Sequence, residues 1–342
     1  MQNVKLKDLV EICYGKNQKQ VEVEDSDIPI LGTGGIVGYA SKPLYNEESV
    51  LIGRKGTISM PFYINKPFWT IDTLFYTKID KNLVIPKYLY YLLCTIGLEH
   101  YTEGAAVPSL TTKTLNEIEL SIHNKEIQQH IVNTIGSVDD LIENCEQKAN
   151  KIFNIGLFKI NLLNQSNELI NFSELAKLEK GIEIGSSNYI ETEEDNTIHY
   201  LRVGDLESIQ NTFIDKDSAK NLANEDDILI AFDGAPGRNN IGLNGSFSSG
   251  IYKVNSTNDL KGLLYFEINS ELNQKIIKDH SQGTTILHAS KSIPYLVSAN
   301  CSSKDKQYLH SLFNELVSLK KKIICLKKNK NVLLDKYFTS QQ

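Results

Sequence analysis

The sequence contains a long internal duplication, and this feature constrains the fold more than any other. Three segments of the first half return in the same order in the second half: Val4–Gly15 as Ile170–Gly181, Val50–Gly56 as Ile228–Gly234, and Gly104–Leu110 as Gly283–Ala289. Apolar, acidic and glycine positions coincide in the first of these pairs. A repeat of this size indicates two copies of one domain and excludes a solenoid of short repeats. Two similar domains on one chain favour a protein that reads two similar targets.

The composition is typical of a soluble globular protein. The 342 residues leave room for two domains that each bury a core, and 41% of them are hydrophobic and 23% charged. No apolar run approaches the roughly 20 residues of a membrane span, and the N-terminus lacks the apolar core of a signal peptide. We therefore expect a cytoplasmic protein that makes no membrane contact. The five cysteines form no Cys-x-x-Cys pair, which predicts free thiols and no metal site.

The net charge of −6 argues against binding nucleic acid through bulk positive charge. Any contact with DNA must then rest on local basic loops, or on a partner that supplies the phosphate contacts.

Each half of the chain has a strand-rich part followed by a long helix. Short β-branched or aromatic runs, bounded by turn residues, predict strands at 28–31, 49–52, 73–77, 227–232 and 250–254. Two short helices are predicted at 86–94 and 260–269. The fold class is therefore α+β, or mixed α/β. We expect two globular domains at 1–122 and 170–300, with the long helices within 123–169 and 301–342.

The two long helices carry heptad stripes of apolar residues. We expect the following seam residues to pair the helices: Ile131, Ile135, Val138, Ile142, Leu312, Leu316, Leu319 and Ile323. Only Lys330 breaks the second seam. The pattern favours an antiparallel coiled coil with one globular domain at each end, which would act as a molecular ruler. The alternative is that each stripe packs onto its own globular domain.

All three arginines of the chain lie at glycine-rich turns after predicted strands. The planar guanidinium matches guanine or a phosphate bidentately, and asparagine can contact adenine. In the alternative interpretation, each arginine pairs with a carboxylate such as Asp72 or Asp233. The predicted DNA-binding residues are Gly34, Gly35, Arg54, Lys55, Thr57, Ser59, Arg202, Asp205, Arg238, Asn239, Asn240 and Asn244.

Catalytic motifs are missing from the sequence. It contains no phosphate-binding loop, no nucleophile elbow, no His-Glu-x-x-His and no amino-methyltransferase motif, and its seven histidines are scattered. We therefore expect no catalytic residue. An enzyme such as a nuclease with an unrecognised carboxylate site is the alternative.

Three segments follow one another before the first heptad helix: Leu51–Ile58, Trp69–Phe75 and Glu103–Thr111. Their order closely resembles that of the specificity (S) subunit of Type I restriction-modification systems, and the resemblance covers both halves of the chain. It departs from the family pattern in two places. The prolines that precede each long helix are lost, and Ala231–Gly234 replaces the Gly-Arg-Lys-Gly of the first half.

The resemblance implies a non-catalytic DNA-specificity subunit. Each target-recognition domain would read one half of a bipartite, asymmetric site on double-stranded DNA, while the paired helices set the spacing and dock two methyltransferase subunits. Those partners would bind S-adenosylmethionine, leaving this chain without a cofactor, and restriction/translocase subunits would complete the complex. Two alternatives stay open: a Type IIB-like system with a fused nuclease-methyltransferase partner, and a coiled-coil scaffold with no role on DNA.

Overall fold

The computed structural model describes residues 1–56, 58, 60–104, 109–209, 211–283 and 287–339. The chain forms two compact units: unit 1 contains residues 1–140 and 328–342, and unit 2 contains residues 141–327. The long helices α4 (Lys125–Ser166) and α7 (Ser303–Leu334) each contribute to both units. The mixture of strands with two long helices confirms the predicted fold class.

Unit 1 contains two four-stranded sheets and a two-stranded ribbon. The first sheet has the order β2 (Val10–Tyr14), β9 (Leu74–Ile79), β6 (Ser49–Gly53), β7 (Phe62–Ile64). The second has the order β3 (Glu22–Val23), β5 (Gly35–Ala40), β4 (Pro29–Gly32), β8 (Trp69–Thr70). The ribbon pairs β1 (Gln2–Lys5) with β10 (Glu119–Ile122). The short helices are α1 (Leu6–Leu9), α2 (Pro86–Leu93), α3 (Thr112–Asn116) and a 3-10 turn at Leu98–Tyr101.

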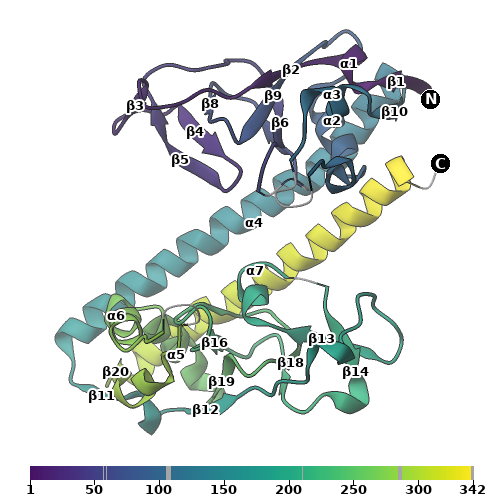
Figure 1. The fold of residues 1–342 in the computed structure, drawn as a ribbon. Helices are drawn as coiled ribbons and strands as arrows, with labels where there is room; N and C mark the ends of the chain where they lie inside the picture. Colours follow the sequence, from purple (N-terminus) through teal and green to yellow (C-terminus); the bar gives the residue numbers. More distant parts are fainter. Residues whose placement is uncertain (57, 59, 105–108, 210, 284–286, 340–342) are drawn as a thin grey trace. The chain divides into compact units, whose positions relative to one another are not determined.

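Unit 2 repeats this arrangement (Figure 1). Its first sheet has the order β12 (Lys177–Lys180), β19 (Ile251–Asn255), β16 (Leu229–Ala231), β17 (Asn239–Asn240). Its second has the order β14 (Phe213–Asp215), β13 (Thr197–Leu201), β18 (Gly245–Phe247), β15 (Leu222–Ala223). The ribbon pairs β11 (Leu169–Asn171) with β20 (Val297–Ala299), and the helices are α5 (Lys261–Ile268) and α6 (Glu271–Asp279). Short 3-10 turns lie at Phe172–Glu174, Ser186–Asn188, Val203–Leu206, Lys216–Ser218, Asn258–Leu260 and Ser290–Tyr295.

The two units share the topology of the first sheet and of three strands of the second, whereas the fourth strand, β3 or β15, joins the second sheet at opposite edges. Each first sheet joins its strands in the same antiparallel order, and each second sheet contains one parallel pair, β4 with β8 and β13 with β18. The predicted short helices correspond to α2 and α5. A full helix, α6, stands where unit 1 has only a 3-10 turn. The duplication is therefore a duplication of fold, with insertions between the shared elements.

Both ends of the chain contribute to the core of unit 1. Phe338, in the π-helical turn Asp335–Thr339 that follows α7, packs against Tyr88 of α2 with ring centroids 5.3 Å apart. Leu334 joins the same cluster, together with Ile131 and Ile135 of α4. These two seam residues pack onto the globular core, as the alternative interpretation of the stripe proposed, as well as onto the end of α7.

Lys330, which breaks the predicted seam, has a specific polar environment in unit 1. Its ammonium lies 2.7 Å from Asp139 of α4, and 5.7 Å and 5.6 Å from the ring centres of Tyr90 and Tyr91. The Tyr91 hydroxyl donates a hydrogen bond to the same carboxylate at 2.5 Å. A paired charge inside an apolar seam disfavours other helix registers, because a shifted register would leave that charge buried without its partner.

Within unit 2, α4 and α7 run antiparallel. Lys148 lies 2.6 Å from Glu315, and Lys159, further along α4, lies 2.6 Å from Asp305 near the start of α7. The seam residues Ile142, Leu316, Leu319 and Ile323 are buried, while Leu312, and Val138 in unit 1, are half-buried. The long helices thus form the antiparallel pair that their heptad stripes predict.

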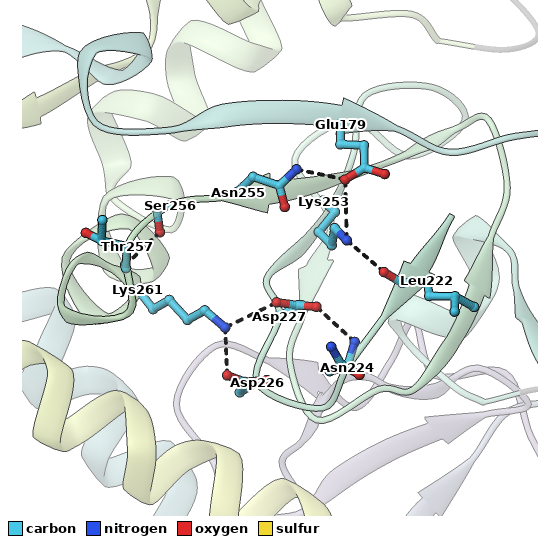
Figure 2. A network of polar contacts seen from close by, with 10 residues as sticks. All are labelled: Glu179, Leu222, Asn224, Asp226, Asp227, Lys253, Asn255, Ser256, Thr257 and Lys261. Carbon is cyan, nitrogen blue, oxygen red and sulfur yellow. Dashed lines mark hydrogen bonds and ion pairs between the residues drawn. The ribbon is translucent and has the colours of Figure 1, made fainter. Parts of the chain in front are cut away.

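A polar network fixes the turn that leads into β16 (Figure 2). The ammonium of Lys261, at the start of α5, lies 2.7 Å from Asp226 and 3.1 Å from Asp227. Asp227 also accepts a hydrogen bond from the backbone N–H of Asn224. Beside it, Lys253 donates to the carbonyl of Leu222. Because Lys261 is almost fully buried, both carboxylates are needed to offset its desolvation.

Buried Glu267 of α5 connects three parts of unit 2. One carboxylate oxygen accepts the backbone N–H of Ala299 in β20 at 2.7 Å, and the other accepts from the Asn164 amide of α4 at 3.0 Å. Burial raises the pKa of this carboxyl, and the hydrogen bonds act in the opposite direction. The side chain therefore ties the sheet ribbon and the long helix to the short helix between them.

Replacing Phe338 with alanine should destabilise unit 1. The substitution leaves a cavity beside Tyr88 and should lower the free energy of unfolding by about 3 kcal/mol. Trp69, the only tryptophan, lies in unit 1 and reports its unfolding by fluorescence in a denaturant titration. Val332→Ala is the matched control, because this side chain is exposed on the same helix. Equal midpoints for the two variants would contradict the packing of the C-terminal turn.

Candidate nucleic-acid interface

Two predicted loops of unit 1 lie against each other. Gly56 has a φ of +80°, and a Cβ at this position would lie 3.2 Å from the hydroxyl of Thr33. A left-handed conformation with this close neighbour favours glycine. Gly34 and Gly35, on the same turn as Thr33, have no atom within 4 Å of a Cβ position, so their backbone is open. The Gly32–Gly35 turn and the Gly53–Gly56 loop therefore form one surface.

The guanidinium of Arg54 lies over an aromatic ring. This group lies 5.4 Å from the ring centre of Tyr14, and its Nη1 donates to the backbone carbonyl of Asp72 at 3.3 Å. The contact is therefore with the carbonyl of Asp72 and not with its carboxylate. Lys55 beside it is exposed, whereas Thr57 and Ser59 lie outside the described residues. A half-buried guanidinium held over a tyrosine ring is well placed to contact a base edge or a phosphate.

Unit 2 repeats the two-loop arrangement with different side chains. Gly234 has a φ of +82°, and a Cβ there would contact Val203, which takes the place of Thr33. Isolated backbone bridges link Lys55 to Ser109 in unit 1 and, at the repeat-related positions, Asp233 to His288 in unit 2. The structure therefore brings together in each unit the two loops that the sequence singled out.

Arg202 and Asp205 have distinct environments in the second copy of the turn. The Arg202 guanidinium lies 5.6 Å from the ring centre of Tyr189, beside an open cavity of about 460 Å³ that Glu191 and Asn211 also line. Asp205 is only 1% exposed, and its carboxylate accepts the backbone N–H of Arg202 at 2.8 Å. The carboxylate of Asp205 thus shapes the turn that presents Arg202.

Arg238 forms an ion pair, as the alternative interpretation of the arginines proposed. Its partner is Glu207 at 2.9 Å, not Asp233. Both side chains are partly exposed, so the pair contributes little to stability and a phosphate could compete for the guanidinium.

The three predicted asparagines differ in their surroundings. Asn239 exchanges two amide hydrogen bonds with Asn269, and Asn240 donates to the carbonyl of Leu206. Both line a cavity of about 470 Å³ in unit 2, which Lys320 of α7 also lines. Asn244 is exposed. The amides of the first two therefore hold the β16–β17 hairpin in place, and Asn244 is the one presented to solvent.

Two further observations concern other classes of function. Among the described residues, no group of three or more His, Cys, Asp or Glu side chains is arranged to hold a metal ion. Within the same part of the chain, no helix has the length and apolar character required to cross a bilayer.

The sequence patterns did not predict Tyr14 and Tyr189, whose rings lie next to the guanidinium groups of Arg54 and Arg202. One signal was present for Tyr14, which directly precedes the repeated glycine of its segment. A Cβ at Gly15 would lie 1.9 Å from the carbonyl oxygen of Ile71, and one at Gly181 would lie 2.2 Å from that of Ser248. Both copies therefore need glycine at a close backbone contact, which fixes the end of the strand that carries the preceding side chain.

Comparison with known proteins agrees with this architecture. Residues 1–154 match the family model of the Type I restriction modification DNA specificity domain. The chain has a TM-score of 0.59 to the crystal structure of a Type I restriction-modification S subunit from M. genitalium, covering 100% of this chain and 96% of that one at 16% identity. At this identity the likeness concerns the fold.

Two curated relatives carry related names. A Mycoplasma pneumoniae protein named as a type I specificity subunit is 27% identical over 183 residues, which is 51% of this chain and 59% of that protein. The specificity subunit of the MjaVIII Type I restriction enzyme of Methanocaldococcus jannaschii is 28% identical over 146 residues, or 41% of this chain and 33% of that protein. The first 154 residues are therefore similar to the Type I DNA specificity domain, and both curated relatives are named as specificity subunits. The matches span less than two thirds of the length of either curated relative.

Proposed function

We propose that this chain is the non-catalytic DNA-specificity subunit of a Type I restriction-modification complex, and that each unit reads one half of a bipartite site. The observation that carries the proposal is the two-loop surface, which recurs in both units on the same backbone. In each copy a left-handed glycine, Gly56 or Gly234, packs on the neighbouring turn. A shared scaffold with open loops suits the reading of two DNA segments by one mechanism.

The site should be asymmetric, because the two surfaces carry different chemistry. The loop of unit 1 presents Arg54 and Lys55, whereas the repeat-related positions of unit 2 hold buried Phe232 and the carboxylate of Asp233. A loop with two cations and a loop whose carboxylate is paired within its own unit present different groups to base edges and phosphates. The two half-sites should therefore differ in sequence.

Partner subunits should supply most of the phosphate contacts and the catalytic activities of the complex. A net charge of −6 gives weak long-range attraction for DNA, so phosphate contacts would come largely from the partners. We assign S-adenosylmethionine binding and methyl transfer to two methyltransferase subunits, and DNA translocation and cleavage to restriction/translocase subunits. The antiparallel helices α4 and α7 would set the spacing between the half-sites.

An exposed apolar stripe on α4 supports docking of a methyltransferase subunit. Ile155, Phe158 and Leu162 follow one another at helical spacings of three and four residues, and Phe158 is 66% exposed. They lie on a different face from buried Ile152 and Ile160, which point into unit 2. Large apolar side chains aligned on a charged surface helix mark a contact with another protein.

Mapping methylated bases in cells that express this chain with its partner methyltransferase tests the proposal. We expect methylation at one bipartite, asymmetric sequence, and none when this chain is omitted. Methylation that does not depend on the chain would refute a specificity role.

Replacing Arg54 with alanine should lower the base preference at the first half-site by roughly tenfold. The preference at the second half-site should stay unchanged. The variant removes the guanidinium that lies over Tyr14, and a specific base contact contributes on the order of 1–3 kcal/mol. Arg54→Lys is the matched control for charge alone. If Arg54→Ala retained full preference at both halves, Arg54 would not be a reading residue.

Replacing Phe158 with aspartate should weaken partner binding by at least tenfold, because a charge enters the apolar contact. Phe158→Leu keeps the surface apolar and should bind nearly as well. Affinity is measured by titrating the methyltransferase subunit with each purified variant. Equal affinity for the aspartate variant and the wild-type chain would place the docking surface elsewhere.

A further inference from the structure

The repeat relates a pair of side chains in unit 2 to a different pair in unit 1. The backbone of Lys55 bridges that of Ser109, and the backbone of Asp233 bridges that of His288. Glu103 and Gln282, also repeat-related, bridge Ser109 and His288 respectively. Asp233 and His288 thus occupy in unit 2 the backbone positions that flank the Arg54 loop in unit 1.

Asp233 fixes the orientation of the His288 ring. Nδ1 of His288 lies 2.8 Å from one carboxylate oxygen of Asp233, and the ammonium of Lys180 lies 3.7 Å from the other. Lys180 itself lies over the ring of Tyr252, at 5.6 Å. The Asp233 side chain is 20% exposed, whereas that of His288 is 60% exposed. The carboxylate is therefore held within the unit while the imidazole projects from it.

The carboxylate also determines which ring nitrogen carries the proton. A carboxylate accepts hydrogen bonds, so the Nδ1 that faces it carries a hydrogen, and Nε2 of the neutral imidazole becomes an acceptor. In the DNA major groove, adenine N6 and cytosine N4 present amino donors. An exposed Nε2 acceptor matches these two bases.

We propose that His288, positioned by Asp233, reads an amino-bearing base of the second half-site through Nε2. This inference rests on the proposed function and adds the residue and the class of base. A stabilising role does not explain the pair equally well, since a hydrogen bond to a largely exposed side chain contributes little to folding. Its place beside the Gly234 loop, where unit 1 carries Lys55, fits a role in distinguishing the two half-sites.

The test compares methylation maps of the wild-type and His288→Ala complexes, with the first half-site as an internal control. We expect preference at one position of the second half-site, where wild type selects adenine or cytosine, to fall by about tenfold while the first half-site is unchanged. Unchanged preference throughout the second half-site would overturn the proposal. An equal loss of methylation preference at both half-sites would also overturn it, because that result indicates a structural role.

Asp233→Asn tests whether Asp233 sets the tautomer of His288, with preference at the same base position as the readout. Asparagine can donate its amide hydrogen to Nδ1, which moves the ring proton to Nε2 and converts that atom into a donor. We expect the preference at this position to shift toward guanine or thymine, which present acceptors. Retention of the wild-type base preference in this variant would overturn the role assigned to Asp233. A wild-type map without a bipartite motif would instead reject the proposed function itself, so the two failures are distinguishable.

Discussion

The packing of the last turn of the chain into the first unit is the interaction on which the rest of the structure depends. Phe338 and Leu334 fill the core around Tyr88, so unit 1 is complete only when residues far apart in sequence have come together. The same contact holds the end of α7 beside α4, where Lys330 forms an ion pair with Asp139. Because that charged pair is specific to one register, the heptad seam and the globular core support a single alignment of the two helices.

A second constraint is the set of glycines that the two copies share. Gly15 and Gly181 permit close backbone contacts, and Gly56 and Gly234 adopt left-handed conformations beside the neighbouring turn. These positions preserve the backbone of the two-loop surface, since a side chain at any of them would clash or introduce strain. The side chains between them are free to differ. One scaffold can in this way carry Arg54 in one unit and the Asp233–His288 pair in the other.

Local patterns predicted much of the fold, because periodicity and turn chemistry are properties of short segments. The short helices α2 and α5 and the antiparallel pairing of α4 with α7 follow from apolar spacing. Ile131 and Ile135 also pack onto a globular core whose other residues are distant in sequence. A heptad pattern alone does not distinguish this packing from pairing with another helix. The candidate site was less predictable for the same reason. Asp205 and Asn240 resemble exposed loop residues in sequence, yet backbone groups of the folded unit engage both side chains.

The most direct test of the central claim is selection of DNA from a random-sequence pool by the complex of this chain with its methyltransferase partner. The proposed function predicts two short enriched blocks of different sequence, separated by a constant number of unspecified bases. This result would follow from the proposed reading of one block by each unit. Recovery of a single contiguous block, or of two blocks with variable spacing, would contradict it.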